Sequence, residues 1–324
     1  MAKYLVTGGA GFVGSNLVEA LVDRGESVVV LDNFSTGKRE NLAAFESDIE
    51  ILEGTITDPD ECRAAVRDVD FVLHEAALPS VPRSIEDPQG SNDANVCGTL
   101  NMLVAARDAG VRRFVYAASS SAYGDTEVLP KVETMPGNPL SPYAVAKYTG
   151  ELYCQAFHRI YGLETVALRY FNVFGPRQDP SSQYSAVIPK FIMALLRGES
   201  PQIYGDGEQS RDFTYIDNVV SANLLACEAG PESAGKVFNC AYGERTTLNE
   251  LILMIKDALE CDELVRYHED RAGDVKHSLA DLESIKTHLG YDPAVSVRAG
   301  LEKVIAWYSA QLAEAEPARS ESDR

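Results

Sequence analysis

The chain has 324 residues, of which 45% are hydrophobic, and it carries a formal net charge of −20. This length allows one large domain or two modest ones, and the ordinary apolar content predicts a globular fold rather than disorder. No apolar run reaches the roughly 20 residues needed to cross a bilayer. The strong negative charge argues against nucleic acid as a partner, because phosphates would be repelled over most of the surface.

Six cysteines are scattered along the sequence without a Cys-x-x-Cys pair. We therefore expect buried thiols in a reducing compartment and no metal site. The N-terminus enters a strand directly, without the charged region, apolar stretch and cleavage site of a secretory signal. These features together predict a cytoplasmic protein with no membrane partner.

Short β-branched runs alternate with helical patterns through the first half of the chain. Strands are expected at 4–7, 27–31, 49–53, 71–75, 113–118 and 164–169, and helices at 15–24, 59–67, 94–109 and 141–161. This alternation predicts parallel βαβ units, and so an α/β fold with a Rossmann-type doubly wound parallel sheet. We expect the domain built on this sheet to span residues 1–172.

The pattern changes after about residue 172. A loop at 175–182 is followed by a helix near 188–197, a short strand at 202–204 and mixed segments to 307. We expect residues 173–312 to form mainly a smaller C-terminal α+β lobe that binds the substrate, with segments near 211–240 returning to the first sheet. Residues 313–324 are charged or small and predict a frayed tail.

A glycine-rich turn joins the first strand to the first helix. Gly8 permits the tight turn, Gly11 lets the backbone approach a pyrophosphate, and Gly14 lets the helix pack closely on the strand. The helix N-terminus supplies amide donors and a positive dipole end for phosphates. A glycine trio alone also fits an ordinary tight turn, but the strand before it and the helix after it favour a dinucleotide site.

Asp32 stands at the end of the second expected strand. Its carboxylate can bond the adenosine ribose hydroxyls and would repel a 2′-phosphate, which favours NAD over NADP. Lys38 and Arg39 lie close behind and could soften that preference. A turn or helix cap is the structural alternative for Asp32.

Tyr143 and Lys147 are spaced i, i+4, on one face of the expected helix at 141–161. A neighbouring ammonium and a positive nicotinamide ring would both lower the pKa of the tyrosine, so that Tyr143 could act as a general base. Lys147 would also hold the nicotinamide ribose. This spacing is common on solvated faces, but the cluster Ser119-Ser120-Ser121 follows a strand at the sheet's carboxyl edge, where such folds bind ligands. Ser119 can donate to the substrate oxygen that Tyr143 deprotonates.

These motifs resemble those of the extended short-chain dehydrogenase/reductase family, and most closely its nucleotide-sugar 4-epimerases. The resemblance covers nearly the whole chain. It rests on the glycine-rich opening, Asp32, His74-Glu-Ala-Ala77, Asn95-Val-x-Gly98-Thr99, Ser119-Ser-Ser-Ala-Tyr-Gly124, Ser141-Pro-Tyr143-x-x-x-Lys147, Arg169-Tyr-Phe-Asn172-Val-Phe-Gly-Pro176, Arg211-Asp-Phe-Thr-Tyr-Ile-Asp217 and Arg271-x-Gly-Asp274.

The resemblance implies that Ser119, Tyr143 and Lys147 are the catalytic residues. It implies an NAD site formed by Gly8, Gly11, Phe12, Val13, Gly14, Asp32, Asn33, Ser35, Thr36, Gly37, Thr55, Ile56, Ala76, Ala77, Leu78, Asn95, Tyr143, Lys147 and Tyr170. It implies a site for a UDP-sugar formed by Ser80, Ser119, Ser121, Asn172, Val187, Tyr204, Arg211, Arg271, Asp274 and Ser278.

One of these positions departs from the family's pattern, and two arginines among them suit the expected ligand. Thr55 stands where the family normally offers an Asp to the adenine amino group, so the Thr55 hydroxyl or the backbone at Ile56 would have to accept that hydrogen bond. Arg211 and Arg271 suit a diphosphate, because a guanidinium matches phosphate oxygens in a bidentate fork. A structural ion pair is the alternative for either arginine.

Enzymes of the family that these motifs resemble epimerise, dehydrate, decarboxylate or reduce sugar nucleotides, and all begin with hydride transfer to NAD. The dehydratases place Asp-Glu after the catalytic hydroxyl residue and the decarboxylases a Glu, whereas this chain has Ser120 and Ser121. The lack of these carboxylates favours a 4-epimerase, which needs only rotation of a 4-keto intermediate and hydride return. A 4,6-dehydratase or reductase is the alternative, and a non-catalytic NAD sensor a weaker one.

The resemblance also bears on the sugar and on assembly. Ser278 aligns with a position where small residues admit an N-acetyl group. This predicts UDP-N-acetylglucosamine and UDP-N-acetylgalactosamine as substrates, with UDP-glucose and UDP-galactose also turned over. The helices at 94–109 and 143–161 correspond to those that pair as a four-helix interface in such epimerases, which implies a homodimer.

Overall fold

The computed structural model describes residues 1–180, 186–269 and 276–322. Its centre is a seven-stranded sheet of order β11-β6-β5-β4-β1-β2-β3, with every neighbouring pair parallel. This confirms the predicted doubly wound sheet. The strands are β1 (Lys3–Thr7), β2 (Ser27–Asp32), β3 (Ile49–Glu53), β4 (Phe71–His74), β5 (Arg113–Ser119), β6 (Glu164–Tyr170) and β11 (Lys236–Cys240). Strand order reverses between β1 and β4, and ligands bind at the carboxyl edge of such a reversal.

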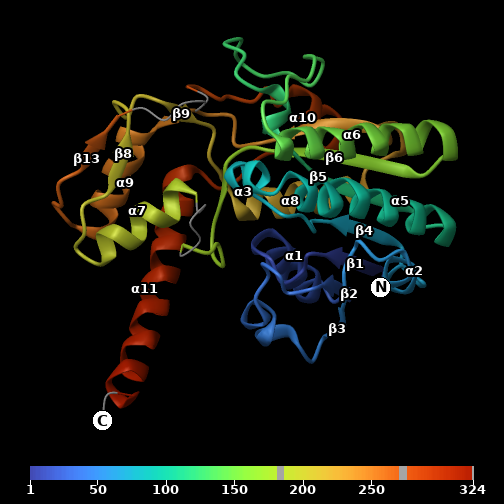
Figure 1. Cartoon of the computed structure of the whole chain (residues 1–324), viewed down its shortest axis with the longest axis horizontal. Coiled ribbons are helices and arrows are strands. Elements are labelled where there is room, and N and C mark those ends of the chain that lie inside the picture. The colour runs from blue at the N-terminus through green and yellow to red at the C-terminus, as the bar shows by residue number, and fades with distance from the viewer. Residues whose placement is uncertain (181–185, 270–275, 323–324) are drawn as a thin grey trace.

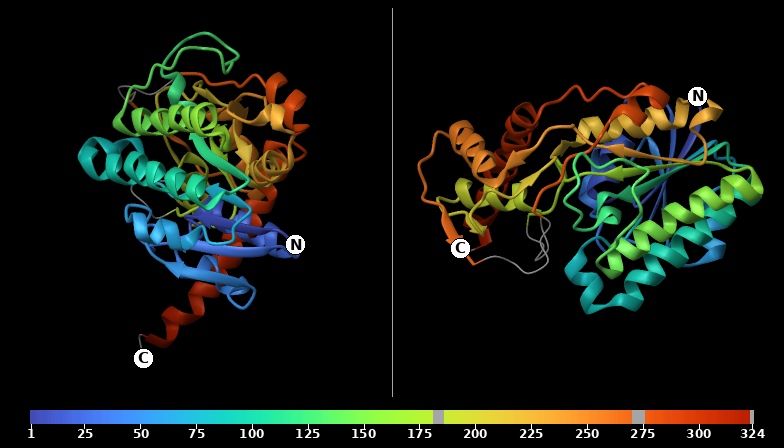
Figure 2. Two further views of the ribbon diagram at one scale, coloured as in Figure 1. Left: turned by 90° about the vertical axis from the view of Figure 1, so that its right-hand side faces the viewer. Right: turned by 90° about the horizontal axis from the view of Figure 1, so that it is seen from above.

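Helices cover both faces of this sheet (Figures 1 and 2). Side chains alternate along each strand, so that Tyr4 and Val6 pack in one buried cluster and Leu5 in the other. The cluster around Leu5 includes residues of α2 (Pro59–Ala65), α5 (Gly98–Ala109) and α6 (Pro142–Tyr161). The opposite cluster includes residues of α1 (Phe12–Asp23), α8 (Ile216–Glu228) and α10 (Glu283–Leu289).

The segment between β4 and α5 is more complex than the single helix expected at 94–109. It contains α3 (Val81–Glu86), α4 (Pro88–Asn92) and one π-helical turn (Asp93–Cys97) that runs into α5. Ser80 and Asp87 begin the two short helices, since their side chains accept hydrogen bonds from backbone amides in the first turns. This segment leads the chain across the carboxyl edge of β4.

The second lobe is built from short strand pairs and three longer helices. The pairs are β7 (Val173–Phe174) with β10 (Thr214–Tyr215), β8 (Gln202–Tyr204) with β13 (Arg266–His268), and β9 (Ser210–Arg211) with β12 (Thr246–Thr247). The helices are α7 (Val187–Leu196), α9 (Leu248–Leu259) and α11 (Val297–Ser322). The expected helix near 188–197 and strand at 202–204 are therefore present, and part of the expected loop at 175–182 lies outside the described residues.

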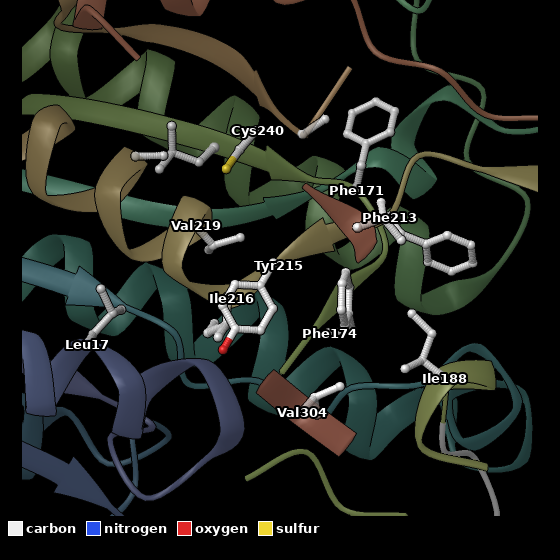
Figure 3. Close-up of a cluster of buried hydrophobic side chains, with 14 of the residues drawn as sticks. Leu17, Phe171, Phe174, Ile188, Phe213, Tyr215, Ile216, Val219, Cys240 and Val304 are labelled. Atoms are coloured by element: carbon white, nitrogen blue, oxygen red, sulfur yellow. The ribbon is translucent and has the colours of Figure 1, made fainter. Parts of the chain in front are cut away.

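One apolar core joins the two lobes (Figure 3). Leu17 of α1 and Val219 of α8 lie at its sheet end, and Ile188 of α7 and Val304 of α11 at its other end. Between them lie the rings of Phe174 and Tyr215 and further side chains, among them Phe171, Phe213, Ile216 and Cys240. Because this core is continuous, the second lobe has a defined position over the carboxyl edge of the sheet.

At the C-terminus α11 continues to Ser322, so that it includes most of the residues expected to form a tail at 313–324 (Figure 1). The fraying of this tail stays a prediction. Residues 310–316 are mostly Ala, Leu and Glu, which are strong helix formers, and they extend a helix already anchored by Leu301, Val304 and Ile305. No helix within the described ranges is both long and apolar enough to cross a membrane.

Cys62, Cys154, Cys227 and Cys240 are buried as expected, whereas Cys97 is exposed.

Candidate active site

The glycine turn between β1 and α1 is closely packed on itself. A Cβ at Gly14 would lie 2.1 Å from the carbonyl oxygen of Gly8, so any larger residue would push α1 away from β1. Gly8 has φ +68°, and a Cβ added to it would lie 2.7 Å from backbone atoms of Ala76. Phe12 and Val13 open α1 directly after this turn. The N-terminal amides of α1 therefore face the crevice, where a pyrophosphate fits the positive end of the helix.

Asp32 ends β2 and organises the loop that follows. Its Oδ2 accepts a hydrogen bond from Ala10 N at 2.9 Å, and its Oδ1 accepts one from Phe34 N at 2.8 Å. Burial raises the pKa of the carboxyl, and these two amide bonds lower it. The loop with Asn33, Ser35, Thr36 and Gly37 then returns to the glycine turn, where Lys38 N donates to Ala10 O at 3.0 Å. Each carboxylate oxygen keeps a lone pair with which it can accept a ribose hydroxyl.

Lys38 and Arg39, which could have favoured a 2′-phosphate, are both engaged elsewhere. The Lys38 ammonium lies 3.2 Å from the Asp179 carboxylate. Arg39 pairs with Glu53 and stacks over the Phe34 ring at 4.0 Å. Together with Asp32, these pairs fit NAD better than NADP.

The turn after β3 carries Thr55 and Ile56, the two residues predicted to contact the adenine. The Thr55 hydroxyl lies 2.9 Å from the Thr57 hydroxyl and accepts from Thr57 N at 3.2 Å. Ile56 is buried, and its carbonyl accepts from Asn101 Nδ2 at 3.1 Å. Asn101 was not among the predicted residues, although it stands three positions after Gly98 in a recognised motif. The Thr55 hydroxyl therefore forms its hydrogen bonds within its own turn.

The loop after β4 carries Ala76, Ala77, Leu78 and Ser80. Asn95 fixes this loop with two bonds: Leu78 N donates to Asn95 Oδ1 at 2.7 Å, and Asn95 Nδ2 donates to Leu78 O at 3.1 Å. Ser80 has φ +100°, a conformation that L residues rarely adopt, and caps α3 by accepting from Arg83 N. The Asn95 side chain therefore shapes the backbone of the cofactor crevice.

The structure brings Ser119, Tyr143 and Lys147 together. Ser119 ends β5, and its Oγ accepts hydrogen bonds from Ser121 Oγ at 2.9 Å and Ser121 N at 3.2 Å. Tyr143 lies in the first turn of α6, where its backbone N donates to Ser84 Oγ of α3 at 3.0 Å. Lys147 is buried one turn later, and its ammonium donates to Ala117 O of β5 at 2.8 Å. Both side chains thus face β5, as the i, i+4 spacing predicts.

The electrostatics of Tyr143 differ from the expectation. Burial raises the pKa of its phenol, a hydrogen bond with Ser119 lowers it, and the charge of Glu75 raises it. The pKa of Lys147 is lowered to about 8, mainly because the ammonium is buried. We expected the lysine to bring the phenol toward ionisation, but for the protein alone desolvation dominates.

A cavity of about 360 Å³ lies beside these residues. Ser119, Ser121, Asn172, Arg211 and Ser278, all predicted to bind the substrate, line it together with Tyr170. Asn172 has φ +35° and its Nδ2 lies 3.4 Å from Ser278 Oγ, so two residues 106 positions apart meet on one wall. Sequence reasoning missed the remaining lining residues, which are Val81, Ser120, Tyr123, Gly124, Lys131, Leu140, Ser141, Ala144 and Phe171.

A second cavity of about 240 Å³ adjoins the first through Asn172 and Arg211, which line both. Val187 at the start of α7 lines it as predicted, with the apolar side chains of Phe174 and Phe213. Tyr204 lines neither cavity, since its ring packs 5.2 Å from His268. Arg271 and Asp274 lie outside the described residues.

Asp212 is a buried residue that the sequence reasoning did not single out. Its carboxylate accepts hydrogen bonds from the backbone N–H groups of Tyr242, Gly243 and Ala280 at 3.1 Å. Burial raises its pKa to about 7. It therefore ties the segment that bears Arg211 to the segment that bears Ser278. The available signal for Asp212 in the sequence was its place directly after Arg211, a residue predicted to bind the substrate.

The fold and this site define an NAD-dependent enzyme, with a dinucleotide crevice at the glycine turn and two joined cavities beside a Ser-Tyr-Lys cluster. The family described as "NAD dependent epimerase/dehydratase family" matches residues 4–241. The chain belongs to this family. Within the described ranges, no group of three or more His, Cys, Asp or Glu side chains could hold a metal ion.

Three similar proteins show how far the likeness extends. The UDP-glucose 4-epimerase of Mycolicibacterium smegmatis is 38% identical over 310 residues, covering 94% of this chain and 98% of that protein. The UDP-N-acetylglucosamine 4-epimerase of Methanobrevibacter ruminantium, solved with UDP-N-acetylmuramic acid, is 42% identical with a TM-score of 0.92, covering 96% of this chain and 99% of its own. The UDP-glucose 4-epimerase of Thermotoga maritima, solved with UDP-glucose, is 39% identical with a TM-score of 0.91, covering 96% and 99%.

Proposed function

We propose that this protein is an NAD-dependent 4-epimerase of UDP-sugars. The observation that carries the proposal is that Ser119, which forms a hydrogen bond with Tyr143, lines a cavity that shares Asn172 and Arg211 with a second cavity. The relatives named as 4-epimerases, which span nearly the whole chain, support the same reaction.

In the proposed mechanism, the Tyr143 phenolate accepts the proton of the sugar 4-hydroxyl. Ser119 Oγ donates a hydrogen bond to the same oxygen, and Lys147, held by Ala117 O, places a positive charge behind Tyr143. Gly8, Gly11, Asp32 and Lys147 would hold NAD, which would supply a hydride acceptor and donor for C4 and a positively charged ring that favours the phenolate. Arg211 would hold the diphosphate, with Val187 beside the nucleotide.

A 4,6-dehydratase or reductase is the second candidate, since the family includes dehydratases. Dehydration needs an additional acid and base at the sugar. Ser120 and Ser121 line the cavity at the positions in question and cannot perform carboxylate chemistry. This favours epimerisation.

We further propose that the sugars are UDP-N-acetylglucosamine and UDP-N-acetylgalactosamine, with UDP-glucose and UDP-galactose also accepted. Ser278 supports this, because its small side chain lies on the cavity wall next to Asn172. Ser278→Tyr should abolish turnover of the acetylated sugars and keep that of the plain hexoses. An unchanged preference would reject this role for Ser278.

The test of the reaction is direct. The purified protein, with and without added NAD, is incubated separately with UDP-N-acetylglucosamine and UDP-glucose while the anomeric protons are followed by NMR. Appearance of the 4-epimer until the two sugars reach equilibrium is expected. Net release of NADH, or accumulation of a keto sugar, would instead identify a reductase or dehydratase.

We also propose that the protein is a homodimer and that it works in the cytoplasm. Within each chain, we propose a boundary at residue 172 between an NAD-binding domain and a substrate lobe. Val145 and Leu152, two turns apart on α6, are 49% and 47% exposed, and Ile160 on the same helix is 68% exposed. An apolar stripe of this kind marks an interaction face. Leu152→Glu should therefore convert a dimer into a monomer in analytical ultracentrifugation. Buried free thiols fit a reducing compartment.

A further inference from the structure

A charged side chain that the proposed mechanism does not use lies at the carboxyl end of β4. Glu75 Oε1 accepts a hydrogen bond from the Tyr170 hydroxyl at 2.8 Å. Asn223 of α8 donates from Nδ2 to that hydroxyl at 2.8 Å and also to Val219 O at 2.8 Å. Tyr170 of β6 and Asn223 of α8 therefore fix the position of this carboxyl group directly after β4.

Glu75 follows His74, which pairs with Tyr116 of β5, and the Lys147 ammonium donates to Ala117 O, the next residue of β5. The two charged groups therefore lie at the carboxyl ends of neighbouring strands, where they act on each other electrostatically. Burial raises the pKa of Glu75 to about 7, against the hydrogen bond from Tyr170 and the charge of Lys147, which lower it. Burial lowers the pKa of Lys147 to about 8, and the charge of Glu75 opposes that change. Each group thus stabilises the charged form of the other.

The other titratable groups around this pair keep one protonation state between pH 6 and 9. Burial lowers the pKa of His74 to about 3, so its ring is neutral. Burial also raises the pKa values of Tyr116, Tyr170, Cys154 and Cys240, so these groups stay protonated. Glu151 of α6 is ion-paired with Arg169. Glu75, Lys147 and Tyr143 are then the groups whose protons decide the local charge.

We propose that Glu75 is a positioning residue for the reaction proposed above, acting as the counter-charge that keeps the Lys147 ammonium protonated beside Tyr143. The inference rests on the proposed function in so far as Tyr143 and Lys147 are the reacting pair. Glu75 acts through Lys147 rather than on the sugar, and it sets the alkaline limit of the pH range in which Tyr143 is effective.

The carboxylate has a second effect whose sign matters for the test. Its charge raises the pKa of Tyr143 directly. Removing it therefore lowers the pKa of both Tyr143 and Lys147. A lower pKa of Tyr143 can move the acid limb of the rate profile only to lower pH. A shift of the alkaline limb to lower pH therefore reports the loss of the proton from Lys147.

The first experiment measures kcat/KM of the NAD-loaded Glu75→Gln enzyme from pH 6 to 10. The alkaline limb should move to lower pH by about one unit, which is the effect of a nearby opposite charge. Since Glu75 is ionised only above its pKa of about 7, the variant and the parent should converge near pH 6. Glu75→Asp, which restores the charge, should move the limb back.

Two further variants control this result. Glu133→Gln alters another half-buried glutamate, which accepts from Asn239 N at 2.8 Å, and should leave the limb in place. Tyr170→Phe removes the hydrogen bond to Glu75 but keeps the carboxyl group. It should shift the limb in the same direction by less than Glu75→Gln, so the proposal stays testable even if Glu75→Gln folds poorly.

A measurement independent of turnover separates this inference from the proposed function. Potentiometric titration of four holoenzymes (the parent, Glu75→Gln, Lys147→Met and the double variant) isolates the Lys147 proton as the difference made by Lys147→Met. That proton should be released about one pH unit lower without Glu75. An unchanged Lys147 titration, or a rate reduced equally at every pH, would overturn the inference. An inactive parent would overturn only the proposed reaction.

Discussion

The cofactor end and the sugar end of this site are constructed differently. At the cofactor end, the glycine turn, Asp32 and the loop after β4 follow strands β1, β2 and β4, and backbone groups of each are held by hydrogen bonds to residues fewer than 25 positions away in the chain. At the sugar end, Asn172, Arg211 and Ser278 come from three distant segments, of which the first and the last are 106 positions apart, and these segments meet through Asp212.

This difference has a physical consequence. A crevice built on backbone contacts tolerates no added atoms, but its shape follows from the local fold. A cavity built on side chains from distant segments depends on the core that holds the second lobe over the sheet (Figure 3). We therefore expect changes at the cofactor end to affect NAD binding, and changes at the sugar end to affect the UDP-sugar alone.

The largest effect is expected from Gly14→Ala. The new Cβ would lie 2.1 Å from Gly8 O, a backbone atom that cannot move without opening the turn. We expect no bound NAD, no activity, and a loss of unfolding free energy of about 3 kcal/mol, as for overpacked cores. NAD content after gel filtration and urea unfolding measure these outcomes.

Gly25→Ala serves as the matched control, because its Cβ would meet no atom within 4 Å although Gly25 also has a positive φ of +72°. It should lose about 1 kcal/mol from backbone strain and keep its NAD. Equal loss of NAD in both variants would show that close packing at Gly14 is not the cause.

Arg211→Ala should act at the sugar end only. Removing a charged hydrogen-bond donor from a diphosphate costs about 1.5–3 kcal/mol, so KM for the UDP-sugar should rise between about tenfold and a hundredfold. NAD content should not change. Arg245→Ala, an exposed arginine of the same lobe that lines neither cavity, is the control. A drop in NAD occupancy in Arg211→Ala would contradict the separation of the two ends.

Asp32→Asn tests the preference at the adenosine ribose. The amide keeps an acceptor for Ala10 N but removes the charge, so NAD should bind about tenfold more weakly, equivalent to one charged hydrogen bond. NADP should gain relative to NAD, because a 2′-phosphate is no longer repelled. Calorimetric titration with both dinucleotides measures the ratio, and an unaltered ratio would assign the discrimination to other residues.

The smallest effect concerns stability at acid pH. His74 is buried between Thr7 Oγ1 at 2.8 Å and Thr99 Oγ1 at 3.0 Å, and burial lowers its pKa to about 3. Because the unfolded chain takes up a proton near pH 6.5 and the folded protein does not, His74 stabilises the fold above that pH, and this contribution is lost as the pH falls. The loss is about 1.4 kcal/mol per pH unit below 6.5.

His74→Asn removes the titrating ring and keeps a hydrogen-bonding side chain. Its unfolding free energy should depend less on pH between 6.5 and 5 than that of the parent. Chemical unfolding at several pH values checks this, and parallel curves for the two proteins would mean that His74 is protonated in the fold.

Most of the sheet could be predicted from the sequence, since buried parallel strands form β-branched runs and the six strands of the first half deviate by at most one residue at either end. β11, α8 and α10 were not predicted as separate elements, because they are short or are placed by contacts with the completed sheet. The single helix expected at 94–109 failed to show the π-helical turn, because a π turn has no distinct side-chain pattern.

The site was predictable where one motif lies on one element. Tyr143 and Lys147 share α6, and Gly8, Gly11 and Gly14 share one turn, so spacing was sufficient. The place of Tyr204 was not predictable, because the pairing of β8 with β13, which brings its ring against His268, has no local signal; its role in substrate binding stays a prediction. Glu75 had a visible signal, a charged residue directly after the apolar run Phe71–His74, whose meaning depends on Tyr170 and Asn223 from later in the chain.

Tyr143→Phe in a protein that retains NAD tests the central claim, that the Tyr143 phenol moves the proton of the sugar hydroxyl. The account predicts that interconversion of the UDP-sugars, followed by NMR, slows by about 10²–10⁴-fold, the usual contribution of a general base, with NAD content unchanged. Interconversion at the parent rate would contradict it.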